Sequence, residues 1–162
     1  MYALTALLLT ACSLTGGKGG KWRSESEIKK LTIREITHIV EKWGYHRNLS
    51  LYDEYATEYF SEQLLDKLHE AETAAKRAGD DMFMDFDPWS EGQDPDPKTR
   101  CEIKDVYDIT DSTATVDINM TQWKVPKQKT LYLFYTGKGW RIDDFTIDED
   151  ERTMRDFLES LL

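Results

Sequence analysis

The feature that most constrains this fold is a change in hydrophobic period near residue 100. Before that point, apolar residues recur every three to four positions, which is the spacing of amphipathic helices. After it, apolar and polar residues alternate, most cleanly from Thr113 to Met120, as in a half-buried strand. Helices that precede a run of strands are typical of an α+β protein with helices packed on a curved antiparallel sheet.

The helical half divides into three segments. A capping-box pattern that begins at Ser24 predicts a first helix, which should end near Trp43. A short helix is expected over residues 51–59, where tyrosines recur at helical spacing. Ser61 is a suitable N-cap for a further helix, and Gly79 should end it.

The second half predicts an antiparallel meander and a short C-terminal helix. Strict alternation places the side chain of Tyr107 on the same face of the first strand as Cys101 and Ile103. Lys124, Lys127 and Lys129 would form a basic hairpin tip, which is usually a solvated turn; the alternative is a tip that steers the domain toward anionic lipid or an acidic partner. The expected strands and final helix cover residues 101–109, 113–120, 131–135, 140–147 and 154–161.

The first eleven residues, MYALTALLLTA, predict the signal peptide of a bacterial lipoprotein. This apolar run is too short to span a bilayer as a helix, which takes about 20 residues, and it ends in small residues, as secretory signals do. Leu9-Thr10-Ala11-Cys12 resembles a lipobox, so Cys12 is the expected lipidation site, although no basic residue precedes the apolar run. The alternative is a buried N-terminal strand or helix with a chance cysteine.

Composition indicates one globular domain behind this segment. Residues 12–20, the lipidated cysteine and a glycine-rich stretch, should form a flexible tether, and residues 21–162 a single domain. The net charge of −10 would repel phosphate backbones, so no nucleic-acid partner is expected. With Cys12 acylated, Cys101 is left without a disulfide partner, and no Cys/His cluster suggests zinc. The sequence predicts no metal and no cofactor.

Three stretches together resemble a known family. They are the loop from Asp85 to Asp94, the strands of residues 101–120, and the segment GWRIDDF that ends at Phe145. They are similar to an uncharacterised family of secreted bacterial proteins and lipoproteins, domain of unknown function 3828. That family looks similar to the nuclear transport factor 2-like and cystatin-like α+β cones. The resemblance implies a cone-like fold and a place in the cell envelope, and it implies no reaction.

The acidic loop carries a candidate functional motif, made of Asp85, Asp87, Gln93 and Asp94. Carboxylates suit calcium, but their spacing does not match the EF-hand loop. Aspartate also accepts backbone N–H bonds in turns, and the Asp87-Pro88 step favours such a turn. A structural loop is therefore favoured over a metal or catalytic site.

A pocket between helix and sheet is the second candidate site, lined by Trp43, Tyr55, Trp140 and Asp144. Alternation places Asp144 on the same inner face as Trp140, where a carboxylate would gain a raised pKa and could act as an acid or base. Phe145 also has the pattern of a buried residue, so the alternative is a bulge that turns Asp144 outward.

No nucleophile, phosphate-loop or metalloprotease motif is present in the sequence. The leading hypothesis is a membrane-tethered envelope lipoprotein with a non-catalytic domain that binds a protein or a small apolar ligand. One alternative is a small acid–base or hydrolytic enzyme that uses a pocket carboxylate. Another is an immunity or accessory protein that neutralises a toxin.

Overall fold

A four-stranded antiparallel sheet organises the part of the chain that the structure describes. The structure, a computed structural model, describes residues 25–45, 56–80, 83–84, 86, 88–89, 96, 98–148 and 150–162. The strands pair in chain order, so each hairpin joins neighbours: β1 (Arg100–Tyr107), β2 (Thr113–Gln122), β3 (Val125–Tyr135) and β4 (Trp140–Phe145). The predicted signal peptide, Cys12 and the predicted tether lie outside the described residues.

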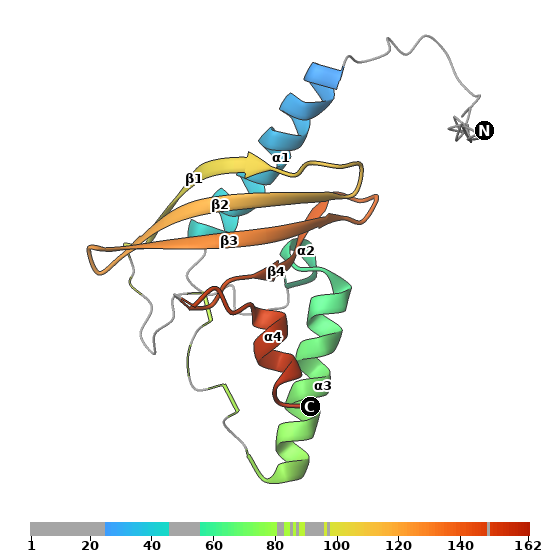
Figure 1. Cartoon of the computed structure of the whole chain (residues 1–162), viewed down its shortest axis with the longest axis vertical. Helices are drawn as coiled ribbons and strands as arrows, with labels where there is room; N and C mark the ends of the chain where they lie inside the picture. Colours follow the sequence, from blue (N-terminus) through green and yellow to red (C-terminus); the bar gives the residue numbers. More distant parts are fainter. Residues whose placement is uncertain are drawn as a thin grey trace, which may run out of the picture.

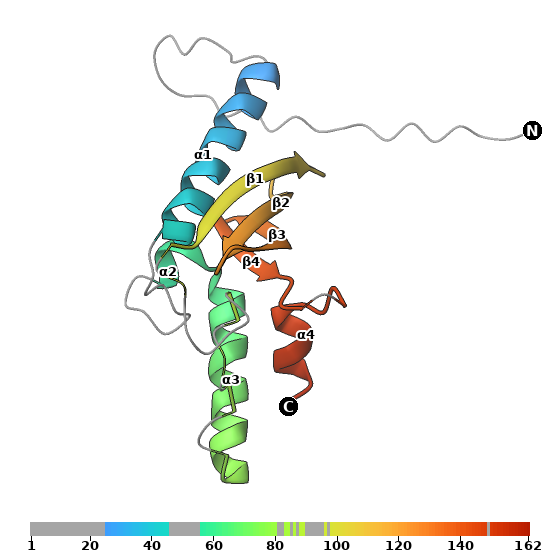
Figure 2. The same ribbon diagram turned by 90° about the vertical axis from the view of Figure 1, so that its left-hand side faces the viewer.

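The helices gather on one side of this sheet and below it (Figures 1 and 2). The longest helix lies along one sheet face and packs against β1 and β4. Another projects away from the sheet, and the short C-terminal helix lies beside it. The helices are α1 (Glu25–Tyr45), α2 (Ala56–Tyr59), α3 (Glu62–Ala78) and α4 (Met154–Glu159). The chain is therefore an α+β protein, as the change of period predicts.

The hydrophobic core lies between α1, α3 and one face of the sheet, which we call the inner face. Its β2 and β3 residues are fully or almost fully buried: Val116, Ile118, Met120, Leu131 and Leu133. The opposite or outer face carries the polar side chains of β2. Burial of this apolar set supplies the main free energy that holds the helices to the sheet.

Helix α3 begins and ends where the sequence predicts. The Ser61 hydroxyl accepts a hydrogen bond from the backbone N–H of Leu64 at 3.1 Å. Gly79 follows the last turn with φ 82°, a left-handed conformation that glycine adopts without a Cβ clash. By contrast, α1 continues two residues past its expected end at Trp43, as far as Tyr45.

A β-bulge corrects the expected face of Tyr107. Ile103 pairs with Ile118, but Asp105 pairs with Asp117, so Lys104 is an extra residue in β1. The extra residue reverses the alternation beyond it. Tyr107 therefore lies on the outer face, where its hydroxyl contacts a carboxylate oxygen of Asp117 at 3.2 Å.

No helix in the described part of the chain combines the length and the apolar character needed to cross a membrane.

Ser61→Ala should lower the free energy of unfolding by about 1–2 kcal/mol, the usual cost of losing an N-cap. The hydroxyl also donates to Asp143 Oδ1 at 2.5 Å, so the loss should fall at the upper end of that range. The measurement is the urea unfolding midpoint. Ser112→Ala, at an exposed position in the β1–β2 turn, is the control. Equal midpoints for the two variants would contradict the prediction.

Candidate functional site

A cleft opens between the first half of α1 and the end of the sheet that carries the β1–β2 turn and the β3–β4 hairpin. It has a volume of about 510 Å³. Lys29, Leu31 and Glu35 line it from α1, while the β1–β2 turn and the β3–β4 hairpin line the opposite wall. The cleft therefore lies between helix and sheet, where the sequence predicts a pocket.

An aromatic pair forms the sheet side of this cleft. The rings of Tyr135 and Trp140 meet edge to face, with centroids 5.4 Å apart. Trp140 is buried and Tyr135 is 38% exposed, so the tyrosine ring is the accessible part of the pair. Aromatic pairs prefer this geometry, which leaves the exposed ring fixed in direction. The wall can therefore accept an apolar or ring-shaped group without rearranging.

Charged side chains surround the aromatic wall. Lys29 and Glu35 lie on the helix side, while Asp108 and Asp111 lie on the turn side. Asp108 has a φ of 50°, a left-handed conformation that aspartate tolerates better than most residues. Among the described residues, the lining includes no histidine, cysteine or serine, so it offers neither an imidazole base nor a thiol or serine hydroxyl.

Of the four predicted pocket residues, the structure places only Trp140 in this cleft. Tyr55 and the side chain of Trp43 lie outside what the structure describes. Asp144 is not on the inner face. Tyr132 pairs with Asp144 but Leu133 pairs with Ile142, so Asp143 is an extra residue that turns Asp144 to the outer face. The prediction from strict alternation that Asp144 lies on the inner face is therefore wrong, and the bulge given as the alternative is present.

Asp144 caps the C-terminal helix. Its Oδ1 accepts hydrogen bonds from the backbone N–H of Phe145 at 2.9 Å and of Arg155, in the first turn of α4, at 3.1 Å. Burial raises the pKa of Asp144, and its hydrogen bonds with Arg155, Thr153 and Phe145 only partly offset that rise. The residue does not line the cleft. Its surroundings are those of a helix cap.

Asp143, the bulge residue, joins both lower helices to β4. Its Oδ1 accepts from the Ser61 hydroxyl at the start of α3 and from Arg155 Nη2 in α4, at 2.7 Å for the latter. Arg155 Nε also donates to the backbone carbonyl of Asp143 at 3.0 Å. The pair is half-buried, so its charge-assisted bonds are less screened than those on an open surface.

Lys129 is a buried cation that sequence reasoning placed wrongly on a solvated hairpin tip. It is 2% exposed, and its Nζ donates to the backbone carbonyls of Thr146 at 2.9 Å and Pro88 at 3.4 Å. The ammonium also lies 6.0 Å from the centroid of the Phe145 ring. The β2–β3 register places it on the inner face opposite Ile118. Lys129 lies two residues before the buried Leu131, so the alternation of faces along the strand already indicated the inner face.

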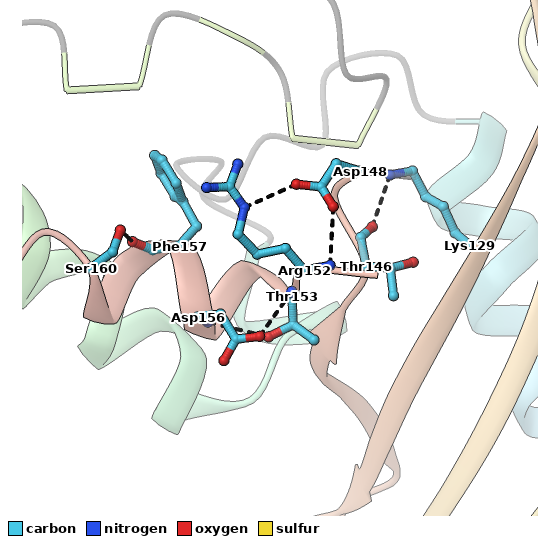
Figure 3. A network of polar contacts seen from close by, with 8 residues as sticks. All are labelled: Lys129, Thr146, Asp148, Arg152, Thr153, Asp156, Phe157 and Ser160. Carbon is cyan, nitrogen blue, oxygen red and sulfur yellow. Dashed lines mark hydrogen bonds and ion pairs between the residues drawn. The ribbon is translucent and has the colours of Figure 1, made fainter. Parts of the chain in front are cut away.

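The segment after β4 is held by a second polar network, drawn in Figure 3. Arg152 Nε donates to Asp148 Oδ2 at 2.9 Å. Thr153 and Asp156 exchange side-chain and backbone bonds in a capping box at the start of α4. This network fixes the chain between β4 and the last helix.

Cys101 is buried at the start of β1, on the inner face opposite Met120. Burial raises the pKa of its thiol to about 12, against a smaller lowering effect of Lys129. The thiol is therefore protonated at neutral pH and is not a nucleophile there.

The acidic loop motif of Asp85, Asp87, Gln93 and Asp94 lies outside the described residues, as does Cys12. Neighbouring aromatic residues of the same loop pack on the domain. Trp89 is buried with its ring 6.3 Å from that of Phe145, and the Phe86 ring meets Phe157 edge to face at 5.5 Å. The described residues include no group of three side chains suited to hold a metal ion.

Comparisons with known proteins identify no family. No family model and no curated protein matches the chain. Among solved structures, it is similar to a phospholipid-binding protein from Ralstonia solanacearum, in complex with a phospholipid, at 6% identity and a TM-score of 0.37. The likeness covers 83% of this chain and 66% of that protein, so the chain spans just under two thirds of its length. A likeness of this degree carries neither fold nor ligand over to this chain.

Asp144→Asn should change how stability depends on pH. The pKa of Asp144 is raised above its ordinary value of 3.8. Its contribution to stability is therefore present below that value and is lost as the pH rises through the raised pKa. Relative to the uncharged variant, the wild type should lose stability as the pH rises from below 3.8 through the raised pKa.

The measurement is the urea unfolding midpoint of both proteins across that range. Working with the difference between them cancels the titration of the other carboxylates. A difference that grows in favour of the wild type as pH rises would contradict the prediction, because the helix-cap bonds would then outweigh burial.

Proposed function

We propose that this chain is an envelope lipoprotein whose domain binds a ligand without catalysis in the cleft between α1 and the sheet. The observation that carries the proposal is the cleft of about 510 Å³ with the exposed ring of Tyr135 on its wall. Its volume falls within the range of small-molecule sites, about 300–1,000 Å³.

The chemistry of the cleft favours binding over reaction. Asp144, the carboxylate on which the acid–base alternative rests, is on the other face of the sheet and bonded to the start of α4. The Thr110 hydroxyl in the lining bonds to Thr113, which keeps it in the turn. With an aromatic wall and a charged rim, the site suits recognition of shape and polarity.

The ligand would be a small apolar molecule or an apolar side chain of a partner protein. Leu31 and Ile109 offer apolar surface on the two walls, and Tyr135 offers a ring for stacking. Lys29 and Glu35 would then orient a polar end of the ligand at the mouth.

The membrane part of the proposal rests on the sequence. Signal peptide, lipidated Cys12 and glycine-rich tether would hold the domain close to a bilayer in the bacterial envelope. The resemblance to the uncharacterised family and its cone-like fold belongs to the same proposal, supported by a four-stranded meander with helices on its inner face.

Tyr135→Ala should weaken binding of a neutral apolar probe in the cleft. With N-phenyl-1-naphthylamine, whose fluorescence rises in apolar sites, we expect the Kd to increase about tenfold from loss of the aromatic contact. Tyr132→Ala is the matched control, because Tyr132 is also an exposed tyrosine of β3 but lies on the outer face. Equal effects of the two substitutions would contradict a site in the cleft.

Cys12→Ser should abolish lipid attachment and move the protein from the membrane fraction to the soluble fraction. Intact-protein mass spectrometry and labelling with radioactive palmitate measure the change. Cys101→Ala is the control and should keep the label, because its thiol is buried and protonated. Lipid on the Cys12→Ser protein would refute the assigned anchor.

A further inference from the structure

A second hollow lies on the outer face of the sheet, at the end opposite the cleft. It has a volume of about 830 Å³. Its floor is formed by Arg100 and Glu102 of β1 and by Asn119 and Thr121 of β2, and the β2–β3 turn closes one end. We propose that this groove binds a carboxylate-bearing saccharide, stacked on Trp123 and held by the surrounding cations.

The turn presents Trp123 in an unusual way. Trp123 and Lys124 form the two central residues of the β2–β3 hairpin turn, with φ values of 49° and 66°. Such turns normally use Asn-Gly, since bulky side chains are disfavoured at positive φ. Strain of this kind persists where the surroundings hold it and often marks a functional position. In this conformation the indole side chain of Trp123 is 59% exposed.

A buried carboxylate holds the turn in place. Asp96 Oδ2 accepts from the backbone N–H of Trp123 at 2.6 Å, and Oδ1 accepts from that of Lys98 at 2.8 Å. Asp96 is 7% exposed, so these charge-assisted bonds form away from water. One residue thus fixes both walls of the groove, the tryptophan on one side and Lys98 on the other.

Three cations surround the groove on a protein with a net charge of −10. Lys98, Arg100 and Lys124 are all exposed, and no salt bridge among the described residues uses any of them. Arg100 presents a planar guanidinium that can hold a carboxylate by two parallel bonds. This part of the surface therefore favours an anion.

Glu102 favours anions that also carry hydrogen-bond donors. It lies on the floor, opposite Asn119 in the neighbouring strand, and a carboxylate can only accept hydrogen bonds. A ligand there must offer O–H or N–H donors besides its negative charge. A sugar acid meets both needs, and the C–H face of its ring can lie on the indole. A polyacidic peptide offers fewer side-chain donors, and a bilayer surface does not enter a groove with a polar floor.

The test uses the full-length protein and hexagalacturonate, followed by intrinsic tryptophan fluorescence and by calorimetry. We expect binding that weakens with added salt, as contacts between exposed charges do. Cellohexaose, the uncharged comparison, and hexaglutamate, the acidic peptide comparison, should each bind at least tenfold more weakly. Equal binding of either one, or no binding of hexagalacturonate, would overturn the proposal.

Substitutions locate the site. Trp123→Ala and Arg100→Gln should each raise the Kd for hexagalacturonate about tenfold. Tyr132→Ala and Lys138→Gln, on exposed residues outside the groove, are the matched controls and should leave the Kd unchanged. Tyr135→Ala should also leave it unchanged, which separates this groove from the cleft.

Trp123→Gly distinguishes loss of the indole from a loss of binding that is caused by unfolding. Glycine accepts the positive φ of the turn, so its urea midpoint should equal or exceed that of the wild type. The proposal requires that this stable variant still binds hexagalacturonate more weakly than the wild type does. A variant that binds as well as the wild type would show that the indole has no part in the site.

Discussion

One extra residue in β4 determines how the lower half of the molecule is attached to the sheet. The bulge at Asp143 gives two consecutive carboxylates to the helices: Asp143 to Ser61 and Arg155, and Asp144 to the first turn of α4. Phe145 then returns to the inner face and packs into the core. A regular strand would leave one of these carboxylates facing the core without a helix to receive it. The bulge thus makes the acidic pair a structural joint between sheet and helices.

Local signals were enough to predict much of the fold. Ser61 and Gly79 mark the ends of α3 because caps depend on the residues beside them. The alternation in β2 is equally local. The faces of Tyr107 and Asp144 were not predictable in the same way, because a bulge is set by the register with a partner strand. Lys129 was misplaced for a related reason, since its acceptors come from segments 17 and 41 residues away in the chain.

The candidate sites show the same division. Trp140 could be placed in a helix–sheet pocket from its pattern in β4, but the partner ring, Tyr135, follows from the β3–β4 register. The groove on the outer face was missed because Lys124 was assigned to a solvated basic hairpin tip and the neighbouring Trp123 was not considered together with it. The signal was their position in a two-residue turn, where glycine or asparagine is usual. The cleft and the groove lie at opposite ends of the sheet and share no lining residue. Two ligands could therefore bind without competition.

The burial of Cys101 has a consequence for a chain with two cysteines. A thiol with a pKa of about 12 exists as thiolate in only about one molecule in 10⁵ at neutral pH. Disulfide exchange requires the thiolate, so Cys101 is protected kinetically as well as sterically. In an oxidising compartment, the folded domain would neither capture a foreign thiol nor cross-link to a second copy of itself.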